Sequence, residues 1–570
     1  MDRQRGGGPW ATVRAEKLVV IAVHNITALT RLLDVLPLVA GDTRVQVRFA
    51  ITGSSAFTDG TADFLSGIGA HPLGWDEAAR SRPDLVVTAS HGGDLRRSGA
   101  PVLILPHGIG YNKYLARESG NPGIRESGNP GIRESGNPGI RESGNPVFGL
   151  SREWLVDADG QMIPSALVLS HVEQLNRLSA ACPEAVPVAV VAGDPCLDRM
   201  VASLPLRAVY RAGLRTRGRT VVVVSSTWGG QSLFGMDPGF VGRLAARLPV
   251  DRYQVVVALH PNAWAWHSRW QVEMWLRECV RAGVVVLDPV EGWRAAVVAA
   301  DLVIGDHGSV SLYSAALGRP VALAVAPESA VDPASAIGRM LAVAPRFTLD
   351  GQVADRVDEL VAQPVSPRMA AVGELASSRR GESARLLRTT LYRLVDLPEP
   401  AEPADSAAVP VARPQGDQGR SHLVSARVVA VSDDAVDMEV VRYPAAALDG
   451  WGGGAAHLVV GLDEPYRRLL ELAEVVVVDG AEQEAVEVLA SLPGCLLAGV
   501  ASTRPVVLST GGSRVEFEVV RGEHPDAAAL CASAVHRWLV DGRELAALPR
   551  LLRLRVGRSP LDVEVRDLAR

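Results

Sequence analysis

Residues 301–325, DLVIGDHGSVSLYSAALGRPVALAV, constrain the fold more than any other part of the chain. The pattern predicts a buried strand, a tight turn at residues 305–309, a helix and a second buried strand. We expect Ser309 or Ser311 to cap the helix, whose first amides have no partner within it. A helix that begins at the carboxyl end of a parallel strand binds phosphate readily. The segment therefore predicts a phosphate-bearing ligand with His307 beside it.

Composition narrows the class of protein. A length of 570 residues indicates about three domains. The net charge of −6 provides no overall basic field, so we expect no nucleic-acid partner. The five cysteines form no CxxC pair, which argues against a disulfide framework or a zinc site and suits the cytoplasm. No apolar run reaches the roughly 18 residues of a membrane span.

Two series of apolar strands alternate with helices. This alternation predicts two parallel sheets, each covered by helices on both faces. Strands are expected at 18–23, 45–52, 85–89 and 102–105, and then at 221–225, 253–259 and 284–287. Helices are expected at 27–39, 238–248, 267–282, 291–300, 353–363, 367–378 and 382–395. Residues 166–174 and 190–200 are interpreted as the connection between the two series.

The pattern divides the chain into five parts. Residues 1–16 are interpreted as a flexible tail, 17–192 as the first Rossmann-like domain and 193–395 as the second, with trailing helices. Residues 396–420, rich in Pro, Ala and Asp, are expected to form a linker. Residues 421–570 predict a smaller α/β or α+β domain, in which Trp451 begins a glycine run that we interpret as a turn.

Residues 117–146 contain a perfect tandem repeat. RESGNPGI occurs three times and is followed by RESGNP. These units have almost no apolar content and cannot build a core. We interpret them as a length-variable surface loop, and the alternative is a lid or an interaction arm.

The first strand-end motif is PHGIGYNK at residues 106–113. His107 leaves a predicted strand into the glycine turn at Gly108, so its ring can face a cleft and act as a general base. Lys113 can balance phosphate charge. The alternative is a helix-entry turn with a structural histidine.

Three further motifs follow predicted strands of the second series. Ser225, Ser226 and Thr227 precede Trp-Gly-Gly, where small residues let backbone amides approach a phosphate. His260, in LHPN, can contact a phosphate or a ribose. In the turn at 305–309, Asp306 is a candidate catalytic residue that can orient His307 or bind a hydroxyl, while Gly308 and Ser309 supply amides and a hydroxyl. Each motif alone could be an ordinary loop, and together they favour one cleft.

These motifs resemble those of the CDP-glycerol glycerophosphotransferase family, within the transferases of the GT-B fold. The matching pieces, over roughly residues 100–330, are HGIGYNK at 107–113, GDPCLDRM at 193–200, SSTWG at 225–229, LHPN at 259–262 and DHGSVSLYSAALGRPV at 306–321. Two turns depart from the family pattern, because Ile109-Gly110 stands where the family tends to carry Thr-Pro, and Asp306-His307-Gly308-Ser309 replaces Asp-Tyr-Ser-Ser.

The resemblance implies that the two Rossmann-like domains bind different substrates. The second domain would hold a nucleotide diphosphate substrate and the first an acceptor. His107 would be the base, and His260, Asp306, Ser309 and Ser311 would meet the phosphates. The resemblance also implies no obligatory metal or other cofactor.

The sequence thus favours a cytoplasmic transferase that moves a sugar or polyol-phosphate group from a nucleotide-activated small molecule to an acceptor hydroxyl of unknown identity, as in cell-envelope polymer synthesis. A sugar-nucleotide epimerase or hydrolase and a catalytically silent nucleotide-binding scaffold are the alternatives. Peripheral contact with the inner face of the membrane is a further possibility. It would use the basic amphipathic helix at 382–395, although such helices more often pack on a core.

Overall fold

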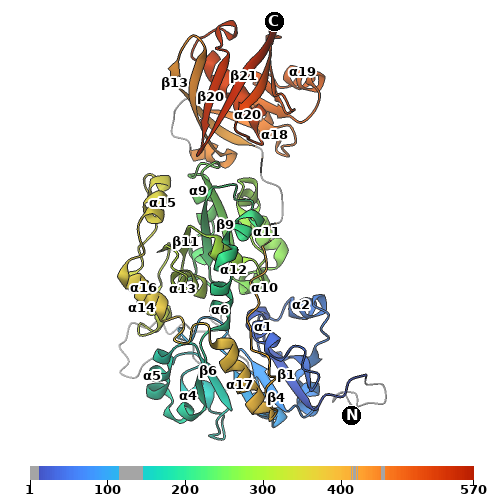
Figure 1. Cartoon of the computed structure of the whole chain (residues 1–570), viewed down its shortest axis with the longest axis vertical. Helices are drawn as coiled ribbons and strands as arrows, with labels where there is room; N and C mark the ends of the chain where they lie inside the picture. Colours follow the sequence, from blue (N-terminus) through green and yellow to red (C-terminus); the bar gives the residue numbers. More distant parts are fainter. Residues whose placement is uncertain are drawn as a thin grey trace.

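The computed structural model describes residues 12–114, 146–412, 414, 419, 421–450 and 456–569. The RESGNPGI copies, most of the tail and part of the linker therefore lie outside the described residues, as does Trp451. Figure 1 shows three bodies stacked along the long axis, with the first domain at one end and the C-terminal domain at the other. No described helix is both long enough and apolar enough to cross a bilayer.

The first body is built on a parallel sheet of seven strands. Their order is β3-β2-β1-β4-β5-β6-β7. The strands are β1 (Lys17–Val23), β2 (Val45–Ile51), β3 (Leu73–Gly74), β4 (Leu85–Thr88), β5 (Val102–Ile104), β6 (Ala166–Leu169) and β7 (Ala189–Val191). The interpretation of 166–174 and 190–200 as a connection is wrong, because β6 and β7 complete this sheet.

The helices of the first body cover both faces of its sheet. They are α1 (Ile26–Leu33), α2 (Thr61–Gly67), α3 (Trp75–Arg80), α4 (Arg152–Leu155) and α5 (Val172–Ala181). The helix predicted at 27–39 ends early, and a 3₁₀ turn (Leu36–Val39) with Pro37 near its start follows. A proline has no backbone N–H to continue the α-helical ladder.

The second body is a parallel sheet of five strands, ordered β10-β9-β8-β11-β12. Its strands are β8 (Thr220–Ser226), β9 (Tyr253–Leu259), β10 (Val285–Val286), β11 (Leu302–Gly305) and β12 (Val321–Leu323). Neighbouring valines of β8 face opposite sides: Val221 joins one core and Val222 the other, and both are fully buried. Burial on both faces explains the continuous apolar runs and confirms the α/β fold of two Rossmann-like domains.

Helices surround this second sheet and lead into the trailing segment. They are α6 (Pro195–Ala202), α7 (Arg207–Gly213), α8 (Leu233–Met236), α9 (Phe240–Ala245), α10 (Pro261–His267), α11 (Arg269–Arg281), α12 (Trp293–Ala299), α13 (Ser309–Ala316), α14 (Ala336–Val343), α15 (Val353–Ala362), α16 (Pro367–Glu374) and α17 (Ser383–Val395).

The last of these helices returns to the first body. Leu387, Leu391 and Val395 of α17 are buried with residues of β1 and α1 in one core. The sequence assigned this helix to the second domain, whereas it packs on the first (Figure 1). Because its apolar face is covered, α17 offers no free apolar face to a membrane.

The C-terminal body combines helices and strands, as expected of a smaller α/β or α+β domain, and its strands form a closed barrel. Nine strands close in the order β13-β14-β20-β21-β19-β18-β17-β16-β15. They are β13 (His422–Val431), β14 (Ala435–Pro444), β15 (Ala456–Gly461), β16 (Val475–Val478), β17 (Leu497–Val500), β18 (Val506–Ser509), β19 (Arg514–Arg521), β20 (Leu551–Val556) and β21 (Ser559–Ala569). The helices are α18 (Arg467–Leu472), α19 (Glu482–Ser491) and α20 (Ala527–Val540).

The barrel core is organised around α20. Leu530, Ala534 and Trp538 of this helix share one buried cluster with residues from all nine strands. On the outer face of β16–β18, α19 covers a separate cluster that contains Val476 and Ala498. Closure removes the unpaired edges that an open sheet would expose.

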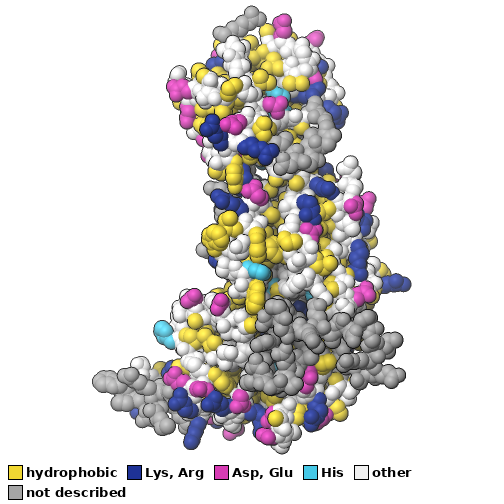
Figure 2. All heavy atoms as spheres, turned by 180° about the vertical axis from the view of Figure 1, so that it is seen from behind, with side chains coloured by type: hydrophobic (Ala, Val, Ile, Leu, Met, Phe, Trp, Pro, Cys, Tyr) yellow, Lys and Arg dark blue, Asp and Glu magenta, His cyan; other side chains and the backbone are white. Residues whose placement is uncertain are grey.

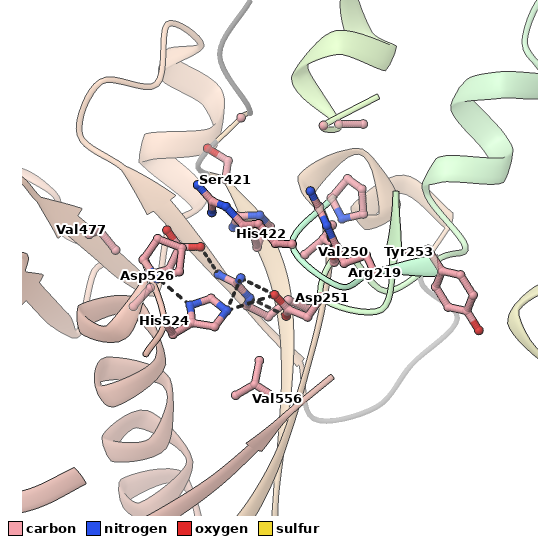
Figure 3. A pocket seen from close by; sticks show the side chains of 18 of the residues that line it. Arg219, Val250, Asp251, Tyr253, Ser421, His422, Val477, His524, Asp526 and Val556 are labelled. Carbon is pink, nitrogen blue, oxygen red and sulfur yellow. Dashed lines mark hydrogen bonds and ion pairs between the residues drawn. The ribbon is translucent and has the colours of Figure 1, made fainter. Parts of the chain in front are cut away.

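A buried guanidinium joins the barrel to the second body, and Figure 3 labels three side chains around it, Asp251, His524 and Asp526. Arg442 of β14 pairs with both carboxylate oxygens of Asp251, at 2.8 and 2.6 Å, and with Asp526 at 2.8 Å. His524 lies 3.3 Å from Asp251. The ion pair with Arg442 holds the pKa of Asp251 well below its usual range, against the effect of burial.

We expect Arg442→Met to loosen this junction, because it leaves two carboxylates without their cation. Loss of one partner of a buried ion pair costs on the order of 3–5 kcal/mol. Calorimetry should show the barrel unfolding at a lower temperature than the rest of the chain. Arg427→Met is the control, since Arg427 is an exposed arginine of the neighbouring strand β13 that pairs with Glu439. Equal effects of the two substitutions would contradict the assignment.

Candidate functional site between the two Rossmann-like domains

A cavity lies between the two Rossmann-like bodies, at the carboxyl ends of their strands. Residues of both series line it. Of the predicted site residues, His107, Gly108, Lys113, Ser225, Ser226, Thr227, His260, Gly308 and Ser309 line the cavity. Asp306, His307 and Ser311 do not. A second cavity on the side of the first domain shares His107, Lys113 and His260, so these three side chains stand where the two cavities meet.

His107 follows β5 and faces the cavity without a hydrogen bond to any described residue. Its ring lies 5.7 Å from that of Phe148. Burial and the charges of Lys113 and Arg31 lower the pKa of His107 to about 4. The imidazole is therefore neutral at physiological pH and has a free nitrogen that can accept a proton.

His260 is fixed by the start of α10. Its Nδ1 accepts the amide N–H of Asn262 at 3.1 Å, so the ring's proton is placed on Nε2. Burial and the charges of Lys113 and His107 hold the pKa of His260 well below its usual range. The neutral ring can thus donate a hydrogen bond into the cavity. Thr27 of the first domain donates to Asn262 at 3.3 Å, which ties this turn across the cleft.

Lys113 is the cation at the centre of the site. Its Nζ lies 5.6 Å from the centroid of the Trp228 ring, within range of a cation–π interaction. Its charge lowers the pKa of His107, His260 and His307. An anion bound here would be attracted by the same charge.

Asp306 lies behind the cavity, where it fixes the two loops of the second domain. It is fully buried, and its carboxylate accepts the amides of Thr227, Gly308 and Leu233 at 2.8, 2.9 and 3.0 Å. Burial raises the pKa of Asp306, and the three amides oppose that rise. Among the described residues Asp306 makes no hydrogen bond to His307, and its side chain does not line either cavity. Asp306 is a positioning residue.

His307 and Ser311 also point away from the cavity. The Oγ of Ser311 donates to the carbonyl of Asp306 at 2.9 Å. His307 is buried, its Nδ1 has no hydrogen-bond partner among the described residues, and burial together with Lys113 lowers its pKa to about 3. The hydroxyl of Ser311 therefore holds the turn, and neither side chain lines the cavity.

The N-terminus of α13 borders the cavity. Gly308 is its N-cap, no side chain caps it, and Gly308, Ser309 and Val310 line the cavity. The prediction that Ser309 or Ser311 caps the helix is wrong, because Ser309 Oγ instead accepts the amide of Ile109 from the first domain at 3.4 Å. The first amides of α13 remain available to an anion.

Sequence reasoning missed Arg31. This side chain of α1 is 3% exposed and donates to both oxygens of Asp194, at 3.1 and 3.0 Å. It also donates to the carbonyl of Gly108 at 2.8 Å and to the Tyr313 hydroxyl at 2.5 Å. The available signal was an arginine among apolar residues in ITALTRLL. The side chain of Asp194 caps α6 by accepting the amide N–H of Leu197 at 2.8 Å.

Among the described residues, no group of three or more His, Cys, Asp or Glu side chains could hold a metal ion.

No family model matches the chain, and no curated protein matches its sequence. Several solved structures resemble this chain at low TM-scores. The wall teichoic acid polymerase TagF is 12% identical, with a TM-score of 0.43 over 70% of this chain and 92% of that one. The UDP-GlcNAc 2-epimerase from Neisseria meningitidis, bound to UDP-GlcNAc, is 14% identical, with a TM-score of 0.37 over 66% and 99%. Anabaena Alr3699/HepE, in complex with UDP and glucose, is 11% identical, with a TM-score of 0.35 over 67% and 100%. The two facing Rossmann-like domains make the fold of this chain GT-B-like.

Acid should destabilise the protein through the histidines around the cleft. Burial lowers the pKa of His24 and His107 to about 4, and that of His91 and His307 to about 3. Below pH 6.5 these histidines bind protons in the unfolded chain but stay neutral in the folded chain. The free energy of unfolding therefore falls as the pH falls from 6.5 toward 4. We expect the free energy of unfolding to fall by about 1–2 kcal/mol for each of these histidines between pH 7 and pH 5. Calorimetry with proton-uptake measurement tests this, and a pH-independent melting temperature over that range would contradict it.

We expect Gly108→Ala to push the two domains apart. A Cβ at Gly108 would lie 2.5 Å from Ser309 Oγ but 3.5 Å from Ser309 Cβ. The variant should melt at a lower temperature, and Ser309→Ala in the same chain should restore most of the loss. Failure of the second substitution to restore stability would show that this close approach does not exist.

Proposed function

We propose that the protein is a transferase that moves a sugar or polyol-phosphate group from a nucleotide diphosphate donor substrate to an acceptor hydroxyl. The observation that carries the proposal is the meeting of His107 and Lys113 with the uncapped N-terminus of α13 in one cavity. These groups come from both domains. A neutral base beside an anion site is the arrangement that such a transfer requires.

The diphosphate would bind at the start of α13. The amides of Ser309 and Val310 would donate to its oxygens, and Ser225 to Thr227, at the carboxyl end of β8, lie nearby. Lys113 would balance the negative charge. Asp288, Val290 and Trp293 line the same cavity, so a nucleoside has an aromatic ring and a carboxylate to contact there.

The acceptor would enter through the second cavity, on the side of the first domain. His107 would take the proton of the acceptor hydroxyl while its oxygen bonds to the transferred group. The bond from that group to the leaving nucleotide phosphate breaks, and the electron pair stays on the phosphate oxygen. The Nε2–H of His260 and the α13 amides would stabilise the charge that develops there.

A second candidate is a protein that binds the nucleotide without turnover. One observation favours it: a histidine whose pKa is about 4 is a weak base in the ligand-free protein. An epimerase or hydrolase is distinguished from the transferase because it consumes the donor substrate in the absence of an acceptor.

The first experiment is a thermal-shift panel of CDP, UDP, GDP, CDP-glycerol and UDP-sugars, followed by turnover assays with the compound that stabilises most. A ligand that binds the folded state raises the melting temperature by mass action. We expect His107→Asn to keep this shift and to lower turnover by 10²-fold or more, in the range of general-base catalysis.

His71→Asn is the matched control, because His71 is exposed and lies outside both cavities. It should change neither binding nor turnover. Binding without turnover in the unmodified protein would favour the scaffold, and turnover that survives His107→Asn would remove His107 from the mechanism.

A further inference from the structure

A cavity of about 400 Å³ lies at the junction of the barrel and the second body, and Figure 3 shows side chains that line it. We call it the junction cavity. The molecule narrows at this junction, with Lys and Arg side chains on both sides of the narrowing (Figure 2). Tyr253, at the start of β9, lines the junction cavity, whereas Leu259, at the end of this strand, lines the cleft. The junction cavity shares none of its described lining residues with either cavity of the cleft, so it is a separate candidate site.

Direct contacts beside the junction cavity hold its two walls together. The amide of Val250, in the second body, donates to the carbonyl of Arg442 of the barrel at 2.9 Å. Arg281 of α11 pairs with Glu464 of the barrel at 2.5 Å and with Glu278 of its own helix at 2.8 Å. The junction cavity is therefore pre-formed, as small-molecule sites usually are.

The charged side chains on one side of the junction cavity already have partners. Arg442 pairs with Asp251 and with Asp526. In this cluster two carboxylates share one guanidinium, so it attracts hydrogen-bond donors rather than anions. Arg281 is neutralised by its two glutamates. None of these four side chains offers a free cation to a ligand.

Two arginines of the second body line the junction cavity without a carboxylate partner. The N–H groups of Arg219 donate to three main-chain carbonyls, at 3.0, 3.1 and 2.9 Å. Neither Arg219 nor Arg217 forms an ion pair with a described residue. Burial lowers the pKa of Arg219 to about 10, neighbouring arginines act in the same direction, and Asp251 opposes them. An anion bound here would favour the charged guanidinium.

The loop that carries these arginines has an unusual backbone. The φ angle is +54° at Arg215 and +48° at Arg217, in the left-handed region that residues other than glycine seldom adopt. Backbone of this kind is concentrated at binding sites. Both side chains are exposed, but Arg217 lines the junction cavity and Arg215 does not. The two residues therefore form a matched pair for substitution.

The barrel side of the junction cavity offers hydrogen-bond acceptors. Asp479 follows β16 and Glu523 precedes α20, and both line the cavity. The ring of His422, which Figure 3 labels, makes no hydrogen bond to a described residue, and burial lowers its pKa to about 4. Carboxylates only accept hydrogen bonds, and a neutral imidazole both donates and accepts. This wall therefore suits hydroxyl groups.

We propose that the junction cavity binds a polyhydroxylated small molecule with one phosphate or carboxylate group, such as a sugar phosphate or a sugar acid. The anionic group would pair with Arg217 and Arg219, because guanidinium groups match the oxygens of phosphates and carboxylates. The hydroxyl groups would donate to Asp479 and Glu523 on the opposite wall.

The lining of the junction cavity does not suit a nucleotide. Among the described residues no Trp or Phe lines it, and the one Tyr, Tyr253, is only 3% exposed. A nucleobase would thus find no indole, phenyl or phenol ring on which to stack, whereas Trp228 and Trp293 line the cleft. The proposal does not rest on the transfer reaction proposed above, and each can fail without the other.

The test is isothermal titration calorimetry of the full chain with glucose 6-phosphate, glucuronate, glucose and inorganic phosphate. We expect both anionic sugars to bind, glucose to give no measurable heat, and inorganic phosphate to bind at least tenfold more weakly than glucose 6-phosphate. Arg217→Asn should weaken the binding of glucose 6-phosphate on the order of tenfold. Asparagine is chosen because it tolerates the left-handed region.

Arg215→Asn is the matched control, because Arg215 shares the loop, the positive φ and the exposure of Arg217 but does not line the junction cavity. It should leave the affinity unchanged. Lys113→Ala, in the cleft, should also leave it unchanged. Absence of binding by both anionic sugars, or equal effects of Arg217→Asn and Arg215→Asn, would overturn the proposal. So would loss of binding in Lys113→Ala, which would place the sugar in the cleft, or inorganic phosphate that binds as tightly as glucose 6-phosphate.

Discussion

The arrangement of the cleft depends on the buried guanidinium of Arg31. It belongs to the first domain, yet it donates to both oxygens of Asp194 at the start of α6 and to the Tyr313 hydroxyl of α13. It also donates to the carbonyl of Gly108, next to His107. Burying this charge is favourable only because its partners are all in place, so the two domains must meet in this register. The position of His107 opposite α13 follows from that requirement.

Asp306 fixes loops within the second domain, as Arg31 fixes the two domains relative to each other. Its carboxylate accepts hydrogen bonds from backbone amides of the loop after β8, of α8 and of its own turn. The backbone amides that we propose bind phosphate are thereby fixed before any ligand arrives, which is how a site stabilises charge without reorganisation. An acidic residue that the sequence indicates as catalytic can therefore instead position the backbone of the site without lining the cavity. The same reasoning explains why Asp306 is fully buried rather than open to the cavity.

The sequence predicted the parts of the fold that depend on local pattern. The strand Tyr253–Leu259 has the predicted bounds, because it is a continuous apolar run. Three strands of the first sheet were missed, since Leu73–Gly74, Ala166–Leu169 and Ala189–Val191 are only a few residues long. The barrel was missed because closure depends on pairing between distant strands. The alternation of Val436, Met438 and Val440 in β14 was a local signal for one of them.

For the site, strand-end position was the useful signal. It predicted that His107, Lys113, His260 and Ser309 lie at one cleft, and all four line the same cavity, because the carboxyl ends of parallel strands meet at one edge. The direction of each side chain could not be predicted in the same way. Asp306 and His307 lie next to the cavity but do not line it. Arg31 was not predicted, because it belongs to a helix in which most residues are apolar.

The most direct test of the account is an experimental structure of the protein bound to the nucleoside diphosphate that stabilises it most. The account predicts the two phosphates between the first amides of α13 and His260 Nε2, with Lys113 close by. A diphosphate bound outside the cleft, for example at the junction of the barrel and the second body, would contradict it.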